Sequence, residues 1–448
     1  MDEASVTRDI GFCTVSTASH LAFCRVLAES VSRTHPGRRL TVLLIDDGER
    51  VHVSANELFD VVSPDQVDLD PAEFRRMAAV YEAIELACAL KPWVIRHQLD
   101  AGFACAVYLD GDTQVFGSLT DLVAAAKSQG VALVPHTYEL LDRDGLEPAD
   151  VNFLRFGSFN GGCLAVADSA QGRRFLAWWS LRLARGAIYS DEEGLYLDQR
   201  WLDLVPPIFD AAIVRDPGLD VAYWNRAAAL EWKDGHYLVG SAPLRLFHYS
   251  GFDPRDPTLL STLNRANPRA TTAANPALAR LTSEYASRLM EQGFEDLAGR
   301  EYRFARTLTG FPLDRRIRRL YRSELLAGER GEGQLPPDPF TEAGAGVFID
   351  WLNEVPEGAR VSRYLGAVYG DRSDVRGRFP VLAGTDRELF LAWAREFGGV
   401  DAHIPAELIP PPPEVEPDRA AVGNEFPAGG LGRLRERIRK GLAGLSRG

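Results

Sequence analysis

The sequence predicts an α/β fold for its first part and a mainly α-helical C-terminal region after it. Apolar runs of strand length alternate with segments of helical periodicity as far as about Arg255, and beyond that residue only helical periodicity continues. Several apolar runs end abruptly in polar residues, which is typical of strands that carry a binding site at one edge of an open sheet. With 448 residues, of which 46% are hydrophobic, the chain is long enough for two or three domains with a substantial core.

The first elements predict a βαβ unit. Residues 10–16 have the pattern of a strand, residues 21–32 that of a helix and residues 40–45 that of a second strand. Polar groups near the ends of the two strands are placed to meet the base or ribose of a nucleotide, and ordinary loop polarity explains each of them equally well. These residues are Thr14, Ser16 and Asp46.

A helical pattern runs from residue 71 to residue 89 and resumes after Leu90-Lys91-Pro92. Proline is favoured in the first turn of a helix, so Lys91 is expected at the start of the second helical segment. A cation opposes the helix dipole there, and an anionic ligand beside Lys91 would remove the conflict. A surface lysine that tolerates its place is the alternative.

The central stretch is residues 103–116, an apolar run that is broken by Asp110-Gly111-Asp112. The run predicts a buried strand, and the two carboxylates would lie in the crevice at its carboxyl end. Gly111 lets the backbone bend so that both carboxylates face one point. A divalent cation relieves their mutual repulsion, and hard oxygen ligands favour Mg²⁺ or Mn²⁺. A solvated Asp-Gly turn is the alternative for this motif taken alone.

Three later motifs follow in order. After a predicted helix at 119–128 and a strand at 131–135, we expect Asn160-Gly161-Gly162 to precede a short strand at 163–166, where it allows close approach to the backbone. Residues 190–202 have the pattern of a helix headed by acidic residues, and Asp198 and Gln199 interrupt its apolar face.

The third motif is a strand pattern at 244–248 that ends in His248. A single histidine in such a place is usually structural. It would complete a carboxylate metal site if its strand returned to the crevice that holds Asp110 and Asp112.

The C-terminal region shows helical patterns at 277–301, 313–326, 348–355, 362–369 and 387–397. The proline run after Ile409 begins a segment, residues 409–430, that we expect to be a flexible linker. Residues 431–448 predict a basic amphipathic helix that would dock on anionic lipid or on a partner. A helix packed on its own domain is the alternative.

Composition excludes some classes of function. A formal net charge of −13 disfavours nucleic acid as a partner. Five scattered cysteines without CxxC spacing indicate reduced, buried thiols in a cytoplasmic protein rather than a disulfide or zinc framework. We expect neither export nor membrane spanning, because the sequence shows no hydrophobic signal region and no stretch of about 18 apolar residues.

The motifs in this order resemble those of nucleotide-sugar glycosyltransferases of the GT-A fold, closest to glycosyltransferase family 8. They are Lys91-Pro92-Trp93, Tyr108-Leu109-Asp110-Gly111-Asp112, Asn160-Gly161-Gly162, Asp198-Gln199 and His248-Tyr249-Ser250-Gly251. Residues 348–353 also resemble a segment in the helical extension of a group of bacterial glycosyltransferases. The resemblance implies a Rossmann-like mixed sheet flanked by helices, with a GT-A catalytic domain at 1–255 and a helical C-terminal region at 256–408.

The activity implied is metal-dependent transfer of a sugar from a nucleotide-diphosphate sugar, a UDP-sugar by preference, to a glycan, lipid-linked or protein acceptor, with retention of configuration. Bacterial polysaccharide biosynthesis is the implied setting, in the cytoplasm, with peripheral contact to the inner face of the membrane through residues 431–448.

The resemblance also implies residue roles. Asp110, Asp112 and His248 would bind Mn²⁺ or Mg²⁺, and Lys91 would stabilise the charge on the leaving diphosphate. Asp198 and Gln199 would lie near the sugar and stabilise an oxocarbenium-like centre. The other donor-binding positions implied, beside the strand-end residues above, are Gly111, Asn160, Gly161, Gly162 and Gly251.

Two features depart from the common family 8 pattern, and they leave the donor sugar and the stereochemical outcome open. The histidine motif lacks a following Lys-Pro-Trp, and a large helical region is appended. The alternative functions are a metal-dependent nucleotidyltransferase, whose usual glycine-rich basic phosphate loop the segment 14–20 lacks, and a non-catalytic scaffold of the same fold.

Overall fold

A computed structural model of the chain describes residues 9–46 and 57–412. The centre of this part is a seven-stranded sheet in the order β10-β6-β7-β4-β1-β2-β3. Its strands are β1 (Ile10–Ser16), β2 (Leu40–Leu44), β3 (Phe59–Val62), β4 (Cys105–Leu109), β6 (Val131–Pro135), β7 (Phe159–Ala167) and β10 (Ala211–Ile213). Within the described sheet β7 runs antiparallel to β4 and β6, while the other neighbours are parallel. The sheet is therefore mixed and flanked by helices, which confirms the expected fold class.

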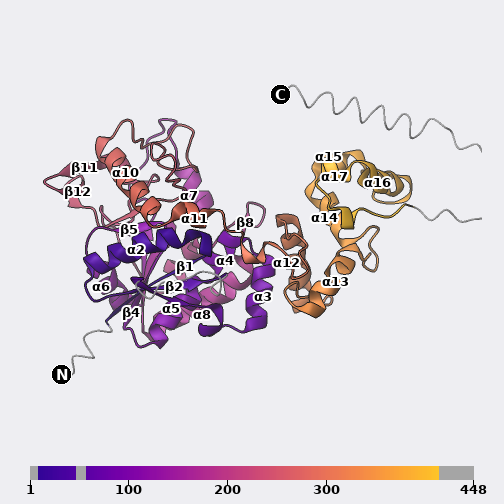
Figure 1. Cartoon of the computed structure of the whole chain (residues 1–448), viewed down its shortest axis with the longest axis horizontal. Coiled ribbons are helices and arrows are strands. Elements are labelled where there is room, and N and C mark those ends of the chain that lie inside the picture. Colours follow the sequence, from indigo (N-terminus) through magenta and orange to yellow (C-terminus); the bar gives the residue numbers. More distant parts are fainter. Residues whose placement is uncertain (1–8, 47–56, 413–448) are drawn as a thin grey trace, which may run out of the picture. The chain divides into compact units, whose positions relative to one another are not determined.

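Helices cover both faces of this sheet (Figure 1). On one face, α2 (Leu21–Thr34) and α6 (Thr120–Gln129) share an apolar core with strand residues such as Phe12 and Val107. On the other, α5 (Lys91–Asp100) packs against β1, β4 and α8 (Ala170–Gly186). Because both faces are covered, the central strands β1, β4, β6 and β7 are mainly apolar.

Shorter elements surround the carboxyl ends of the central strands. They include β5 (Thr113–Val115), which pairs with β14 (Leu246–His248), the hairpin β8 (Tyr189–Ser190) with β9 (Leu195–Tyr196), and the small sheet of β11 (Leu230–Lys233), β12 (His236–Val239) and β13 (Ala242–Pro243). The short helices are α3 (Pro71–Val80), which packs against α8, α4 (Ala83–Ala89), α7 (Asp150–Phe156) and α9 (Val205–Ile208), which precedes β10.

The chain divides into two compact units, residues 1–373 and 374–448. Helices after the sheet in the first unit are α10 (Pro276–Glu291), α11 (Phe294–Ala298), α12 (Arg315–Glu329), α13 (Glu342–Asn353) and α14 (Arg363–Asp371). The second unit holds α16 (Gly384–Glu396) and α17 (Gly398–Asp401), preceded at the boundary by α15 (Ser373–Arg378). Its core contains Phe379, Phe390 and Trp393, whose rings are in mutual contact.

Three sequence-based expectations are corrected by the structure. The predicted helix at 71–89 is broken at Tyr81 and Glu82, where the backbone is extended and a new helix begins. Residues 190–202 form the hairpin β8–β9 and a 3₁₀ helix, Gln199–Leu204, rather than one α-helix, because the acidic residues 191–193 lie in the turn between the two strands. Asn160-Gly161-Gly162 lies inside β7 and not before it, so the triplet is part of the sheet.

Some expectations fall outside the described residues. These are Asp47 and Gly48, which follow Asp46 at the end of the strand predicted at 40–45, most of the linker at 409–430, and the basic segment 431–448. No helix in the described part of the chain is long and apolar enough to cross a membrane.

Candidate active site

The loop after β4 places two carboxylates at the carboxyl end of the central strand. The backbone N–H of Asp110 still donates to the carbonyl of Gly162 in β7, at 2.8 Å, and the hydroxyl of Thr113 donates to the carbonyl of Asp110, also at 2.8 Å. These bonds close the turn from β4 into β5. As a result, Asp110 and Asp112 both project from one tight turn at the edge of the sheet.

His248 is brought to the same turn by strand pairing. β14 runs antiparallel to β5, with His248 opposite Thr113. Its Nε2 lies 3.2 Å from Oδ1 of Asp112. Asp110, Asp112 and His248 each offer one ligand atom, and these atoms all lie within 4.8 Å of one another. The expected convergence of the three side chains is therefore present.

A buried carboxylate holds the far side of the histidine ring. Asp220, which is fully buried, lies with Oδ1 3.3 Å from Nδ1 of His248, and its Oδ2 accepts a hydrogen bond of 2.7 Å from Nδ2 of Asn160. A carboxylate on one ring nitrogen fixes the tautomer that leaves the other nitrogen for a metal, an arrangement common around metal-binding histidines. Sequence reasoning missed Asp220, since it follows a loop and no apolar pattern marks it.

The charges at the site fit a divalent cation. Four carboxylates, from Asp110, Asp112, Asp198 and Asp220, face two cationic side chains, Lys91 and His248, which leaves an excess of negative charge. Two carboxylate oxygens and one imidazole nitrogen are a donor set that Mn²⁺ and Mg²⁺ accept. The residues present therefore suit such an ion.

The pKa values of His248 and Asp112 reflect the attraction between the two side chains. Burial would lower the pKa of His248, but the carboxylates of Asp112 and Asp220 outweigh it and raise that pKa to about 10. Burial would raise the pKa of Asp112, but His248 outweighs it and holds that pKa below its ordinary value. Binding of a cation at Nε2 therefore requires loss of a proton from His248.

Lys91 is the buried cation of the site. It begins α5, as expected, and its side chain is only 2% exposed. Its Nζ lies 3.1 Å from Asp110 Oδ1 and 3.1 Å from Asp198 Oδ2, and it donates to the carbonyl of Gly161 at 3.0 Å. Two carboxylates of the protein itself are thus the anionic groups beside Lys91 that offset its unfavourable place at the start of a helix.

Burial and charge act in opposite directions on this group. Burial would lower the pKa of Lys91, but Asp110 and Asp198 outweigh it and keep that pKa above its ordinary value. Burial raises the pKa of Asp198 in spite of Lys91. The pair is therefore a fixed ion pair rather than two free reactants.

The glycines of β7 are required by these contacts. A Cβ on Gly161 would overlap Oδ2 of Asp198, and a Cβ on Gly162 would lie 2.5 Å from both Asp110 Oδ2 and His248 Cε1. Any side chain here would displace the carboxylates from Lys91 or from the metal-ligand cluster. Close approach to the backbone was the expected role of this triplet.

A cavity of about 640 Å³ opens over these residues. Its floor follows the strand ends from β1, through β4, to β7. The sequence-predicted residues that line it are Ser16, Lys91, Asp110, Gly111, Asp112, Asn160, Asp198, Gln199 and His248.

The remaining sequence-predicted residues lie outside the lining. Asp46 is buried and accepts a hydrogen bond of 2.7 Å from the backbone N–H of Ala18, which stabilises the loop after β1. Thr14 is fully buried in β1. Gly161 and Gly162 lie behind the lining carboxylates, and Gly251 takes a positive φ of 71° beside Leu263.

Sequence reasoning missed the aromatic walls of this cavity. They come from α7, the β8–β9 hairpin and the loop after Asp220, and comprise Phe153, Phe156, Tyr189, Tyr196, Tyr223 and Trp224. Nothing local distinguishes these rings from core residues, because only the tertiary fold brings the segments together. A larger groove of about 1200 Å³ beside α10 and β11–β12 contains Trp232 and Tyr237, whereas the ligand cluster of Asp110, Asp112 and His248 lines the smaller cavity.

Comparison with known proteins gives distant likenesses. No family model matches the chain. YfnF, an uncharacterized protein of Bacillus subtilis strain 168, is 21% identical over 261 residues, which cover 54% of this chain and 81% of YfnF.

Among solved structures, the galactosyltransferase LgtC in complex with donor and acceptor sugar analogues matches with a TM-score of 0.39 and 19% identity, over 62% of this chain and 95% of LgtC. The glycosyltransferase GlyE of Streptococcus pneumoniae TIGR4 matches with a TM-score of 0.36 and 14% identity, over 66% of each chain. Likenesses this distant assign no role to any residue of this chain.

Proposed function

We propose that this protein is a metal-dependent glycosyltransferase that transfers a sugar from a nucleotide-diphosphate sugar, with UDP as the preferred nucleotide, to a hydroxyl acceptor. The observation that carries the proposal is the convergence of Asp110, Asp112 and His248 on one point, beside a buried lysine, in a cavity at the carboxyl ends of β1 and β4. Such a point in an open α/β sheet is where nucleotide ligands bind. We place the catalytic part within residues 1–255.

The donor would lie along the strand ends. Ser16 and its neighbours line the β1 end of the cavity and would contact the nucleoside, while Asp110, Asp112 and His248 would hold Mn²⁺ or Mg²⁺ against the diphosphate. When bound, such an ion neutralises negative charge on the leaving diphosphate. Asp220 and Asn160 keep the His248 ring oriented for this task.

Lys91 supplies a second positive charge that does not depend on the ion. Its ammonium is held by Asp110 and Asp198 in a region that excludes water, so it needs no reorganisation as charge develops. We assign it to stabilisation of the departing nucleoside diphosphate.

Asp198 and Gln199 would act at the sugar. Asp198 is 2% exposed and paired with Lys91, so it is poorly suited to act as a free nucleophile. Gln199 lines the cavity and donates through Nε2 to the carbonyl of Phe156 at 2.9 Å, which leaves its carbonyl oxygen to stabilise positive charge at the sugar carbon. This assignment agrees with a retaining transfer through an oxocarbenium-like centre.

The acceptor class proposed is a glycan, a lipid-linked sugar or a protein, with the reaction in the cytoplasm. A site lined by tyrosines and a tryptophan suits a molecule that combines apolar faces with hydroxyl groups.

The test is a panel of UDP-, GDP- and dTDP-sugars with Mn²⁺, read as donor hydrolysis and as a shift in the unfolding temperature. We expect one nucleotide class to stabilise the protein and its sugar to be released, with both effects abolished by a chelator and by Asp112→Asn. Asp142→Asn is the matched control, because it removes an exposed carboxylate that does not line the cavity. The proposal would be overturned if none of the donors stabilised the protein and none were hydrolysed.

A further inference from the structure

One face of α12 (Arg315–Glu329) is tied to the hairpin β8–β9. The residues are Arg315, Arg319 and Arg322, spaced four and three positions apart, so they lie on the same side of the helix. Nη2 of Arg315 donates to the carbonyl of Tyr189 at 3.0 Å. Both terminal nitrogens of Arg322 donate to the carboxylate of Glu193 in the hairpin turn, at 2.7 and 2.8 Å.

Arg319 reaches the hairpin through Glu85 of α4. The Glu85 side chain is fully buried and is paired with Arg319, one of whose contacts is 3.2 Å. The same carboxylate accepts from the backbone N–H of Tyr189 at 3.2 Å and from that of Glu82 at 3.1 Å. The carbonyl of Tyr189 is thus held by Arg315 of α12. Its N–H is held by Glu85, which is paired with Arg319 of α12.

The hairpin forms one wall of the cavity. Tyr189 and Tyr196 line it and contact each other edge to face, with centroids 4.7 Å apart, and Tyr196 contacts Phe156 at 4.8 Å. Asp198 and Gln199 follow directly in the chain. A hairpin with two residues in each strand is too small to hold its shape alone, so its position depends on what it is tied to.

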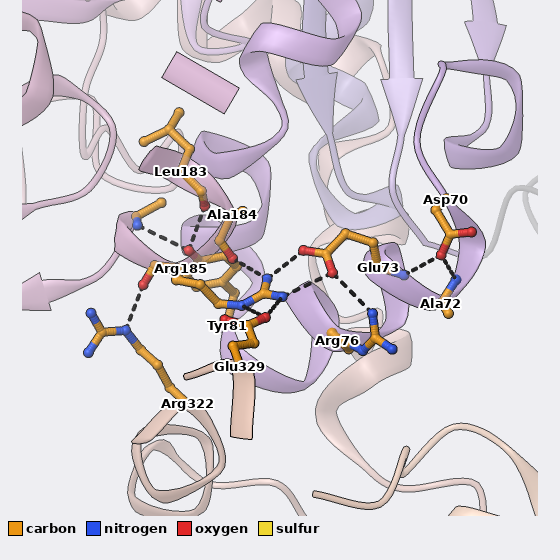
Figure 2. Close-up of polar contacts among 11 residues, drawn as sticks. Asp70, Ala72, Glu73, Arg76, Tyr81, Leu183, Ala184, Arg185, Arg322 and Glu329 are labelled. Carbon is orange, nitrogen blue, oxygen red and sulfur yellow. Dashed lines mark hydrogen bonds and ion pairs between the residues drawn. The ribbon is translucent and has the colours of Figure 1, made fainter. Parts of the chain in front are cut away.

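The helix α12 is itself anchored to α3 and α8. The guanidinium of Arg318, 2% exposed, donates to the carbonyls of Ala78, Tyr81 and Phe304 at 2.6, 2.7 and 2.5 Å, which satisfies the end of α3. Figure 2 shows a second anchor, in which Arg185 of α8 lies between Glu73 of α3 and Glu329 of α12.

Arg322 joins this second anchor to the hairpin. Its Nε donates to the carbonyl of Arg185 at 2.6 Å (Figure 2). Its terminal nitrogens hold Glu193. The α12 clamp, defined as Arg315, Arg319 and Arg322, therefore connects the rigid layer of α3 and α8 to the wall of the cavity.

We infer that the α12 clamp positions the tyrosine wall against which the acceptor binds, so that part of the helical region after residue 255 is a component of the active site. The assignment of this wall to acceptor binding rests on the proposed function. The metal-ligand cluster and Ser16 lie toward β4 and β1, whereas the hairpin adjoins Asp198 on the β7 side. Loosening the hairpin should therefore weaken acceptor binding and spare the nucleotide.

The variants are Glu193→Gln, Arg322→Gln and their combination, with Glu192→Gln as the control in the same exposed turn. Hydrogen exchange of the peptide covering residues 187–198 reads the hairpin directly, without any substrate. We expect faster exchange in both single variants, no further change in the double variant, and wild-type exchange in the control.

Transfer kinetics supply the second readout. We expect the acceptor kcat/KM to fall between about tenfold and about 100-fold in Glu193→Gln, while the affinity for UDP with Mn²⁺ changes less than about twofold. Unchanged exchange in Glu193→Gln would overturn the clamp, and an equal loss of nucleotide affinity would overturn the acceptor-side assignment. If no donor is turned over by the wild type, the proposed function fails, and the exchange data still decide whether α12 holds the hairpin.

Discussion

The ammonium of Lys91 lies 3.1 Å from the carboxylate of Asp198, and each of the two side chains is only 2% exposed. A buried ion pair of this kind is costly to break on one side, because the remaining charge has neither water nor a partner. The pair also joins α5 to the segment that carries Gln199, so it fixes the base of the cavity.

Lys91→Met should destabilise the protein by about 3–5 kcal/mol, since it leaves Asp198 and part of Asp110 uncompensated. Urea unfolding measures the change, and the exposed Lys233→Met is the control. Adding Asp198→Asn should recover part of the loss. Equal stability of the Lys91 and Lys233 variants would contradict a buried pair.

Asp220→Asn should weaken Mn²⁺ binding by about 10- to 100-fold, because Asp220 orients His248 through Nδ1. Calorimetric titration with Mn²⁺ alone measures the affinity without any assumption about the substrate. Asp216→Asn is a comparison in the same loop that removes a carboxylate paired with Arg245 instead. If both variants bind Mn²⁺ as the wild type does, His248 is not oriented by Asp220 for a metal.

Gly162→Ala should cost about 1–3 kcal/mol, because its Cβ would lie 2.5 Å from Asp110 Oδ2 and His248 Cε1 and the neighbours must shift. Gly333→Ala, where nothing lies within 4 Å of the added Cβ, should stay within about 0.5 kcal/mol of the wild type. The Gly162 variant should also lose Mn²⁺ affinity. Retention of full stability and metal binding would show that the site tolerates the methyl group.

His136 should make stability depend on pH below neutrality. Burial lowers its pKa from 6.5 to about 4, so between these values the unfolded chain binds a proton that the folded protein does not. Its contribution is complete above pH 6.5 and is lost as pH falls, by about 2 kcal/mol between pH 8 and pH 5. Urea unfolding of the wild type and His136→Gln at both pH values gives the difference, since other groups titrate in both proteins. Parallel pH profiles would show that His136 does not titrate as described.

Removal of residues 429–448 should abolish any binding to anionic vesicles, because the basic, amphipathic pattern of 431–448 predicts attraction to such a surface. Co-sedimentation with vesicles that contain phosphatidylserine, compared with neutral vesicles, measures the effect. Equal recovery of full-length and truncated protein in the supernatant would remove the lipid interpretation and leave docking on a protein partner.

Local pattern was sufficient for the strands and for the polar residues at their ends. The run before Asp110 is apolar because its strand is covered on both faces, and the change to carboxylates marks the place where that cover stops. The same reasoning placed Lys91 at a helix start and Ile10–Ser16 in a strand, and the structure confirms both.

Local pattern failed where contacts distant in the chain decide the conformation. Residues 190–196 have the acidic start of a helix, but Asp191 and Glu193 instead form ion pairs with Arg155 and Arg322, which hold a hairpin. Asn160-Gly161-Gly162 was expected before its strand, as a point of close approach to the backbone, yet the triplet is inside β7, where Asp198 and Asp110 need the space.

The sequence by itself determined which residues bear charge at strand ends, because an apolar run and the point where it gives way to polar residues are local properties of the chain. Only the tertiary structure decided that His248 meets Asp112, that Asp220 backs the histidine, and that α12 holds the tyrosine wall. Those contacts depend on strand pairing and on buried ion pairs between segments that are far apart in the sequence. Their energies depend on how the segments are placed in space, which the order of neighbouring residues does not reveal.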